Sequence, residues 1–422
     1  MILKNIRYLV TQNQERQILE NIDLRIEEDR ITAIGKNLHP RAEKTVNCSD
    51  KIVMPGLVNA HTHSPMTLLR GISDNKNLQD WLHQDIFPAE QKLEETDIYT
   101  GTLLAGIEML KTGTTTFNDM YDEMEAITAA VENTGIRAVL SKGIIDKQEP
   151  KREEIDKAVE FVDKYQNHPL IKPGFAPHAV YTVREQTLRE LNDYAKIFDT
   201  VYHIHVSETK KENTDCEKEN GKTPIQYLES LNTLNPRFIA AHGVWLNEKD
   251  IEILRKSGST VVHNPNANLK LGSGIAPVTK LLEEGVNVAL GTDGVASNNN
   301  LNMFEEMKIA VNLQKKDSPE TVTEQEVLDM ATINGAKALG LSQDIGSIEI
   351  GKKADLLIID KDKAELTPMH GKRGLISNLV YAFNGNVEHV IVNGELRVKN
   401  GELTDIDEGF VFSKARKIAE KF

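Results

Sequence analysis

The spacing of hydrophobic and polar residues changes along this chain of 422 residues. In residues 1–55 apolar and polar positions often alternate, as at 18–26, and this period of two predicts short strands joined by turns. Residues 1–55 are therefore expected to form the N-terminal part of a small β domain.

From residue 56 onward, short apolar runs alternate with amphipathic segments of helical period, which predicts βα units and a parallel sheet. Asn247 is expected to cap a helix over 248–256 that stops at Gly258. A later helix, through Leu281, is expected to end at Gly285. The strand candidates are 52–58, 114–117, 138–145, 171–176, 201–206, 238–241, 260–262 and 286–290. Eight such units predict an α/β fold, a (β/α)8 TIM barrel, over residues 56–345.

Residues 346–422 return to strand-like spacing, at 354–360 and again at 389–396, where Asn393 and Gly394 form a turn pair. We expect both chain ends to meet in one small β-sandwich domain, followed by a terminal helix. The Lys-rich segment 413–422 has the pattern of that helix and is predicted to be solvated.

Composition narrows the class of function. The formal net charge of −14 opposes binding to nucleic acid and to anionic membranes and favours a small-molecule substrate. Cys48 and Cys216 form no CxxC motif and suit a reducing compartment. With neither a signal peptide nor an apolar run of spanning length in the sequence, a cytoplasmic protein is expected.

Chemistry-bearing residues follow the predicted strands at the ends where barrel enzymes keep their active sites. They are His61 and His63 after the first strand, His178 after the fourth, His205 and Glu208 after the fifth, His242 after the sixth, His263 after the seventh and Asp293 after the eighth. Side chains at positions i and i+2 of a strand share a face, so His61 and His63 can reach one cation. Imidazole is a preferred ligand of Zn²⁺ and related ions, so the pattern predicts a divalent-metal site.

Six motifs carry a family resemblance over the whole length of the chain. They are PGLVNAHTH at 55–63, GFAPH at 174–178, HIHVSET at 203–209, AAHG at 240–243, HNPNANLKLGSG at 263–274 and LGTDG at 290–294, the last followed by SNN at 297–299. The chain resembles the amidohydrolase superfamily, and within it the 5′-methylthioadenosine/S-adenosylhomocysteine deaminases and 5′-deoxyadenosine deaminases.

The resemblance implies one divalent metal ion, with Zn²⁺ the leading candidate, held by His61, His63, His205 and Asp293. The same donor set accepts Fe²⁺, Mn²⁺ or Co²⁺. A two-metal relative would need a bridging carboxylated lysine at the end of the fourth strand. Here that end is the PH pair at 177–178 and Lys172 lies at the other end, so a mononuclear site is expected.

The resemblance also implies the groups that move protons and bind substrate. Glu208 is expected to protonate the purine ring, and His242 and Asp293 to take the proton of the attacking water, although His242 could instead be a core histidine. His178 and Glu90 match positions that contact ribose hydroxyls in the family. For Glu90 the alternative is an ordinary surface residue. His263 is expected to position the loop that follows it and not to bind metal.

Three further positions concern the 5′-substituent of a nucleoside. Trp81 matches a residue lining that pocket, although ordinary packing is the alternative. Lys142 stands where the family can carry an arginine that, with a second arginine near Arg152, grips a homocysteine carboxylate. Lysine cannot make the bidentate fork of arginine, so smaller 5′-substituents are favoured over S-adenosylhomocysteine. Arg152 could instead belong to a solvated helix start.

The sequence thus predicts a metal-dependent hydrolase that deaminates adenosine derivatives, namely 5′-deoxyadenosine, 5′-methylthioadenosine, S-adenosylhomocysteine or adenosine. The alternative within the same class is an aminohydrolase or chlorohydrolase acting on guanine, a pterin or an s-triazine. A minor alternative is a non-catalytic scaffold. Family resemblance also predicts a homo-oligomer.

Overall fold

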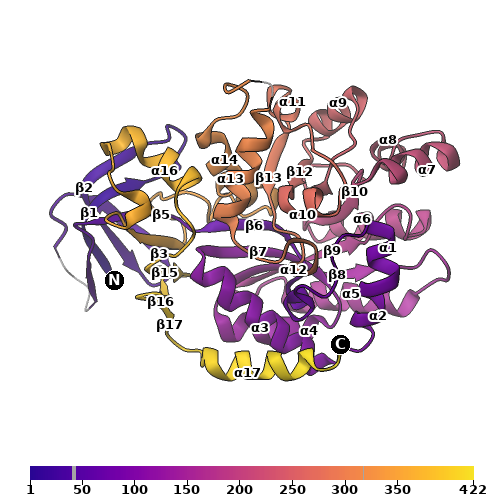
Figure 1. The fold of residues 1–422 in the computed structure, drawn as a ribbon, viewed down its shortest axis with the longest axis horizontal. Coiled ribbons are helices and arrows are strands. Elements are labelled where there is room, and N and C mark those ends of the chain that lie inside the picture. The colour runs from indigo at the N-terminus through magenta and orange to yellow at the C-terminus, as the bar shows by residue number, and fades with distance from the viewer. Residues whose placement is uncertain (40–43, 317) are drawn as a thin grey trace.

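Eight parallel strands form the centre of the computed structural model, which describes residues 1–39, 44–316 and 318–422 (Figure 1). They pair in chain order, each with the next. The strands are β6 (Leu57–Thr62), β7 (Thr114–Tyr121), β8 (Arg137–Ile144), β9 (Ile171–Pro177), β10 (Tyr202–Val206), β11 (Phe238–His242), β12 (Thr260–His263) and β13 (Asn287–Leu290).

The first and last of these strands meet and nearly close the barrel. The Asn59 amide on β6 donates to Thr292 Oγ1 at 2.7 Å and accepts from Thr292 N at 3.0 Å. Next to this contact, Asp293 N donates to the carbonyl of His61 at 3.0 Å. The predicted TIM barrel is confirmed, and its closure brings the eighth strand end to the first.

Helices follow the strands and cover the barrel (Figure 1). The predicted helix after β11 begins at an Asn247 cap, where Asn247 and Asp250 exchange side-chain to backbone hydrogen bonds of 3.0 Å, and Gly258 ends it with φ +70°. The helices of the barrel region are α1 (Leu78–Trp81), α2 (Phe87–Glu90), α3 (Glu95–Lys111), α4 (Met124–Thr134), α5 (Arg152–Tyr165), α6 (Glu185–Ile197), α7 (Lys210–Asn220), α8 (Pro224–Ser230), α9 (Glu248–Ser257), α10 (Pro265–Lys270), α11 (Val278–Glu283), α12 (Val295–Asn298), α13 (Met303–Gln314), α14 (Glu324–Met330) and α15 (Ile333–Ala338), with short turns η1 (Ser64–Leu69) and η2 (Leu82–Ile86).

Both chain ends contribute to a second, nine-stranded mixed sheet, as predicted. Its order is β17-β16-β15-β14-β5-β1-β2-β3, with β4 beside β1. The strands are β1 (Ile2–Val10), β2 (Ile18–Glu27), β3 (Arg30–Gly35), β4 (Thr45–Asn47), β5 (Lys51–Pro55), β14 (Leu356–Asp360), β15 (His389–Val392), β16 (Glu395–Lys399) and β17 (Glu402–Leu403). The two ends join where β14 runs antiparallel to β5. Asn393 and Gly394, both with positive φ, make the predicted turn between β15 and β16.

A buried ion pair ties this sheet to the barrel. Arg137, at the start of β8, donates to both carboxylate oxygens of Asp355 at 2.9 and 3.1 Å. Arg137 also donates to the Pro169 carbonyl and to the Asn393 side chain. The fork geometry of arginine uses both oxygens of the carboxylate, which fixes the orientation of the two units at this contact.

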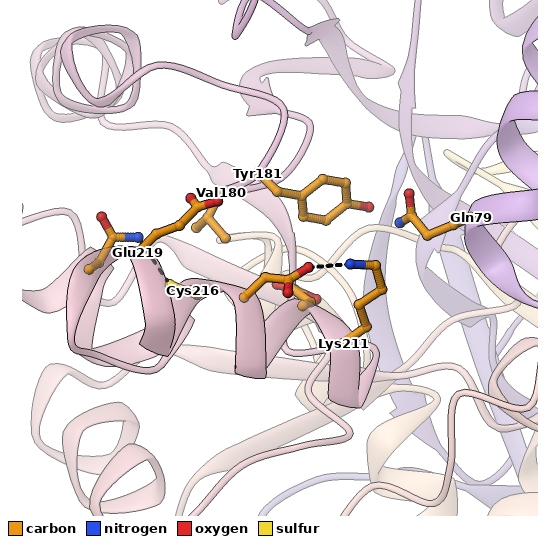
Figure 2. Close-up of a pocket in the computed structure, with 9 residues that line it drawn as sticks. Gln79, Val180, Tyr181, Lys211, Cys216 and Glu219 are labelled. Atoms are coloured by element: carbon orange, nitrogen blue, oxygen red, sulfur yellow. Dashed lines mark hydrogen bonds and ion pairs between the residues drawn. The ribbon is translucent and has the colours of Figure 1, made fainter.

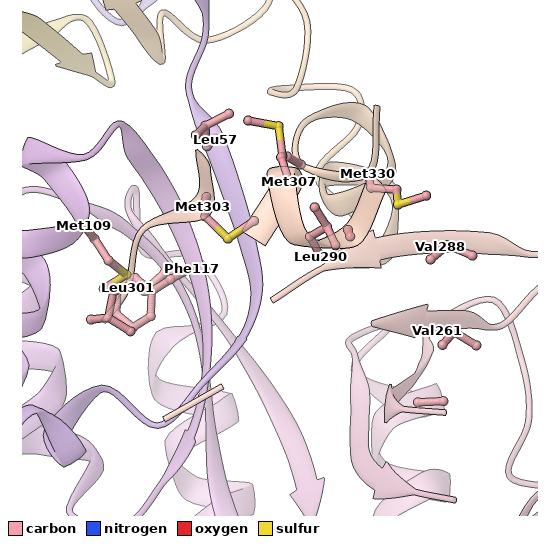
Figure 3. Close-up of a cluster of buried hydrophobic side chains, with 14 of the residues drawn as sticks. Leu57, Met109, Phe117, Val261, Val288, Leu290, Leu301, Met303, Met307 and Met330 are labelled. Carbon is pink, nitrogen blue, oxygen red and sulfur yellow. The ribbon is translucent and has the colours of Figure 1, made fainter. Parts of the chain in front are cut away.

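The main core extends from the barrel strands into the covering helices. Figure 3 shows part of it near β6 and β13, where the side chains include Met303, Met307 and Met330 beside Leu290. Flexible thioether side chains fill irregular space between elements, which suits this junction of a barrel with α13 and α14. A separate cluster holds the apolar side chains of the mixed sheet.

The last two helices, α16 (Leu375–Tyr381) and α17 (Glu408–Ala419), belong to the C-terminal segment. Val411 on α17 packs with Leu103 and Ile107 of α3, so the terminal helix lies against the barrel (Figure 1). Within the predicted segment 413–422 most residues are exposed and Ile418 is buried, whereas the contact with α3 is made by Val411, which precedes that segment. Among the described residues, we find no helix whose length and apolar character would let it span a membrane.

Candidate metal centre and active site

Four side chains from three strand ends converge inside the barrel mouth. His61 Nε2 and His63 Nε2 lie 3.2 and 3.3 Å from the same oxygen, Asp293 Oδ1. His63 Nε2 and His205 Nε2 are 3.2 Å apart. His61 is fully buried, and among the described residues its Nε2 atom has no partner apart from this contact with Asp293. A buried lone pair facing two further imidazoles and a carboxylate fits a cation with nitrogen and oxygen ligands.

The opposite ring nitrogens are also engaged, which fixes the orientation of the rings. His63 Nδ1 donates to the Met120 carbonyl at 2.7 Å, and His205 Nδ1 donates to the His178 carbonyl at 2.8 Å. His61 Nδ1 shares a hydrogen bond of 2.9 Å with His203 Nε2. Such outer contacts aim the Nε2 atoms at a common point, as in metal centres generally.

The turn that carries His61 and His63 is held by Asp119 of β7. Its carboxylate accepts from Thr62 Oγ1 at 2.7 Å, and from Ser64 through both the backbone N–H at 2.7 Å and the hydroxyl at 2.6 Å. These bonds pin the residues on either side of His63. The two predicted ligands are therefore placed by the neighbouring strand and not by their own strand alone.

Burial and the Asp293 carboxylate act in opposite directions on the rings of the cluster. Burial lowers the pKa of His61 to about 4, so this ring is neutral and its lone pair is available. At His63 burial also acts to lower the pKa, but the Asp293 carboxylate outweighs it and raises that pKa to about 9. For Asp293, burial would favour the neutral acid, but hydrogen bonds with His61 and His63 outweigh it and hold its pKa well below the usual range. A neutral imidazole and an ionised carboxylate are the forms that bind metal.

Glu208 and His242 lie beside this cluster. Glu208 Oε2 is 3.9 Å from His242 Nε2, and Glu208 Oε1 accepts from the Ser273 hydroxyl at 3.1 Å. Burial raises the pKa of the Glu208 carboxyl, whereas nearby His242 opposes the shift. His242 Nδ1 donates to Asn268 Oδ1 at 2.9 Å, which leaves Nε2 as the basic atom on the side of Glu208.

Three of the strand ends here place a non-glycine residue in the left-handed backbone region. Ser207, His242 and Asp293 have φ of +53°, +75° and +60°. Each such residue costs on the order of 1 kcal/mol and persists only where surrounding contacts impose it. These three strained residues lie at one end of the barrel, next to the clustered histidines and carboxylates.

A pocket opens beside Glu208, between α1, the turn after β9 and α7. Figure 2 shows Gln79 and Tyr181 facing each other across it, with Lys211 paired to Asp215 on α7. The Tyr181 ring lies 6.3 Å from that of His178 in a T-shaped contact. Glu212 also lines this pocket, so the pocket borders the turn that carries Glu208.

The structure brings His178 and Glu90 toward the site. The His178 ring lies 4.8 Å from the His205 ring, and burial lowers the pKa of His178 to about 3. Glu90 accepts from the Tyr121 hydroxyl at 2.6 Å, and burial raises its pKa. Trp81 is buried in an apolar cluster with Leu82 and others, and its indole N–H has no hydrogen-bond partner in the part of the chain that the structure describes.

Lys142 and Arg152 are engaged with carboxylates of the chain itself. Lys142 is buried and ion-paired with Asp122, and with Glu154 at 2.8 Å. Arg152 is exposed at the start of α5 and paired with Asp156 and Glu190. The structure therefore places Lys142 near the mouth but Arg152 in a surface network, and the substrate roles given to both stay predictions.

Sequence reasoning missed His203 as a member of the site. It lies two residues before His205 on β10, so the period of two puts both rings on one face, and this signal was present in the sequence. Asn118 Nδ2 is 3.1 Å from His203 Nδ1, completing a chain that runs from β7 through His203 to His61. The predicted loop-positioning histidine, His263, is fully buried at the end of β12, and neither of its ring nitrogens has a hydrogen-bond partner among the described residues, so its role stays a prediction.

Sequence similarity to known proteins supports the same assignment of the site. The model of the amidohydrolase family matches residues 52–397. The chain belongs to the amidohydrolase family. It is 43% identical over 406 residues to a 5′-deoxyadenosine deaminase of Methanobrevibacter smithii, covering 94% of this chain and 93% of that one. It is 42% identical over 428 residues to a 5-methylthioadenosine/S-adenosylhomocysteine deaminase of Thermoanaerobacter pseudethanolicus, covering 100% and 98%.

Solved structures agree with this membership. An adenosine deaminase from Xanthomonas campestris with bound zinc superposes with a TM-score of 0.95 at 36% identity, over 100% of this chain and 98% of that one. A triazine hydrolase of Arthrobacter aurescens superposes with a TM-score of 0.94 at 22% identity, over 99% of each chain, which shows the shared fold alone. The prediction of a hydrolase from this family is confirmed.

In this amidohydrolase the end of the fourth barrel strand carries no lysine. Strand β9 ends at Pro177, and His178 follows it. Lys172 is near the other end of the strand, where its ammonium group donates to the Gly340 carbonyl at 3.4 Å. The described residues thus offer no bridging lysine among the clustered ligands, which favours the predicted single metal ion.

Proposed function

We propose that this amidohydrolase hydrolyses the 6-amino group of 5′-modified adenosines, releasing ammonia and the corresponding inosine analogue. The observation that carries the proposal is the buried cluster of His61, His63, His205 and Asp293, with Glu208 beside it. Relatives at 42% and 43% identity bear the names of such deaminases.

In this proposal one divalent ion, with zinc preferred, is held by the three Nε2 atoms and Asp293 Oδ1. When bound, such an ion supplies Lewis acidity and lowers the pKa of water to about 7. The protein prepares the place for it by lowering the pKa values of His61 and His205 through burial and by orienting the rings of His63 and His205 from outside. Metal preference also depends on supply, because the same ligands accept Fe²⁺, Mn²⁺ and Co²⁺.

Proton movement in this scheme depends on Glu208 and His242. Burial raises the pKa of the Glu208 carboxyl, which suits it to give a proton to purine N1 while His242 takes a proton from the attacking water. The proton of the new C6 hydroxyl then passes through Glu208 to the departing ammonia, and His242, 3.9 Å away, returns the water proton to Glu208. His242 Nε2 is free to accept a proton from the attacking water, because Nδ1 donates to Asn268. The Ser297 hydroxyl donates to Asp293 Oδ2 at 2.7 Å and keeps the other oxygen directed at the cluster.

For substrate choice we propose that His178 and Glu90 meet the ribose hydroxyls and that Trp81 borders the 5′-substituent. Lys142 is already neutralised by Asp122 and Glu154, so it offers little attraction to a substrate carboxylate. Small neutral substituents, as in 5′-deoxyadenosine or 5′-methylthioadenosine, are therefore expected to be better than S-adenosylhomocysteine.

The proposal extends to a cytoplasmic location and a homo-oligomeric state. The two cysteines carry free, buried thiols, which suits a reducing compartment. The oligomer is expected from family resemblance and is tested by light scattering after size-exclusion chromatography, where a particle of monomer mass would contradict it.

The decisive experiment follows the loss of the adenosine ultraviolet band with the metal-loaded enzyme. Its substrates are 5′-deoxyadenosine, 5′-methylthioadenosine, S-adenosylhomocysteine, adenosine and free adenine. The proposal expects turnover of nucleosides, with the smaller 5′-substituents ahead, and little turnover of adenine. Absence of nucleoside turnover, with activity on guanine, a pterin or a triazine, would overturn the assignment.

Two variants separate proton transfer from metal binding. Glu208→Gln keeps the shape of the side chain but cannot carry the proton, so it is expected to retain metal and lose turnover. His205→Ala removes a ligand, so it is expected to lose metal affinity as well. Near wild-type activity of Glu208→Gln would refute the proton-transfer role.

A further inference from the structure

We infer that Glu212 is a positioning residue that sets the direction of the Glu208 side chain. The inference rests on the proposed proton-transfer role of Glu208. Glu212 is buried in the first turn of α7, and one of its carboxylate oxygens accepts the backbone N–H of Ser207 while the other accepts that of Glu208, both at 2.8 Å.

The sequence around Glu212 looks like an ordinary helix cap. Thr209 is the N-cap of α7, and its hydroxyl accepts from Glu212 N at 3.2 Å, as in a capping box. In a capping box the acidic side chain returns to the N–H of the cap residue itself. Here it reaches one and two residues further back, to the turn that carries Glu208. The carboxylate thus serves the catalytic turn and not only the helix end.

The turn needs such support because its backbone is strained. Ser207 has φ +53°, in the left-handed region. Its carbonyl accepts from Val244 N at 2.9 Å and from Trp245 N at 2.8 Å, on the far side of the turn. Glu212 supplies the opposing contacts. The turn is therefore held from both sides in the conformation that directs Glu208 toward His242.

Both oxygens of Glu212 are occupied by backbone donors, so this carboxylate acts through Glu208 and not on the substrate. A glutamine at this position has one acceptor oxygen, and its NH₂ group would face a second N–H donor. The backbone at Ser207 or Glu208 would then lose one of the contacts that hold the turn, and the Glu208 carboxylate would keep its hydrogen bond from Ser273 on a less firmly placed backbone. Misplacing a catalytic group by about 1 Å can cost on the order of 100-fold in rate.

The test is a double-mutant cycle in the metal-loaded enzyme with Glu212→Gln, Glu208→Gln and the double variant. Glu212→Gln is expected to lower kcat roughly 10- to 100-fold, with KM for 5′-deoxyadenosine within about twofold. In the Glu208→Gln background the same change should have less than about a twofold further effect, because the group it positions no longer transfers a proton. Glu217→Gln, an exposed change on the same helix, is the matched control.

The outcomes separate the two proposals. Equal losses from Glu212→Gln in both backgrounds, or a loss of bound metal by that variant, would show a general structural role and overturn the inference. An active Glu208→Gln enzyme would instead refute the proton-transfer role itself. If Glu212→Gln does not fold, Glu212→Asp takes its place in the cycle. It keeps the charge but is too short to span both donors, so the same non-additive loss is expected.

Discussion

Releasing Lys142 from its internal partners should change substrate selectivity. Its ammonium group pairs with Asp122 and, at 2.8 Å, with Glu154, and the three groups together carry one net negative charge. The Lys142 side chain is 8% exposed. Of its two acidic partners, Glu154 is 29% exposed and Asp122 is 61% exposed, so Glu154 is the more buried acid. Glu154→Gln removes the negative charge that is least screened by water.

The size of the effect follows from the geometry. A substrate carboxylate that reaches Lys142 would stand roughly 5 Å from Glu154, where the repulsion at an effective dielectric constant of about 20 is about 3 kcal/mol. Because Glu154 is almost a third exposed, we take about half of this value. The remaining repulsion, about 1.5 kcal/mol, corresponds to a factor of about 10 in kcat/KM.

The assay compares kcat/KM for S-adenosylhomocysteine with that for 5′-deoxyadenosine, by the loss of the adenosine band. Glu154→Gln should raise the first about tenfold and leave the second within about twofold, since 5′-deoxyadenosine has no carboxylate. Glu153→Gln is the control, because Glu153 is 81% exposed and pairs with Lys157. An equal change for both substrates, or none for S-adenosylhomocysteine, would refute the reasoning about Lys142.

Three more predictions concern stability. Burial raises the pKa of Glu306 to about 8, so its folded carboxyl stays protonated while the unfolded one ionises, and the free energy of unfolding should fall between about pH 4.5 and pH 8. Denaturant unfolding of Glu306→Gln, which mimics the neutral acid, should show a flatter pH dependence over that range, and parallel curves would contradict this. Chelation should lower Tm, measured calorimetrically, because an ion that binds only the folded protein is then removed from His61, His63, His205 and Asp293, and one equivalent of Zn²⁺ should restore Tm. Asp355→Asn should cost about 3–5 kcal/mol in denaturant unfolding, since Arg137 is left buried without its counter-charge. Asp199→Asn, at an exposed pair with Arg237, should cost less than about 1 kcal/mol.

The barrel and most of its chemical centre could be predicted because both follow from local sequence signals. A strand is recognised by its apolar run, and the residue after the run lies at the barrel mouth whichever way the helices pack. His61, His242 and Asp293 are positioned by this logic. His203 could have been found in the same way, since it shares a face of β10 with His205.

Partnerships between distant segments could not be read from the same signals. Lys142 alternates on β8 like any strand residue, but its two partners come from the end of β7 and from α5. Whether a lysine at a barrel mouth is free to bind a substrate depends on those neighbours, because a second carboxylate nearby cancels its charge. The same limit applies to Arg152. Its substrate role was expected from a family match at this position, but the sequence did not show that its partners on the surface of α5 would be Asp156 and Glu190.

Glu212 shows why even a recognisable motif can conceal a function. The spacing from Thr209 to Glu212 is explained completely by helix capping, so the sequence offered no reason to look further. Only the left-handed backbone at Ser207 turns two N–H groups toward that carboxylate. Backbone strain that places Glu208 therefore also creates the donors that Glu212 satisfies. The Glu212 side chain therefore both supports the start of α7 and orients Glu208. The double-mutant cycle measures how much of the rate loss in Glu212→Gln depends on Glu208.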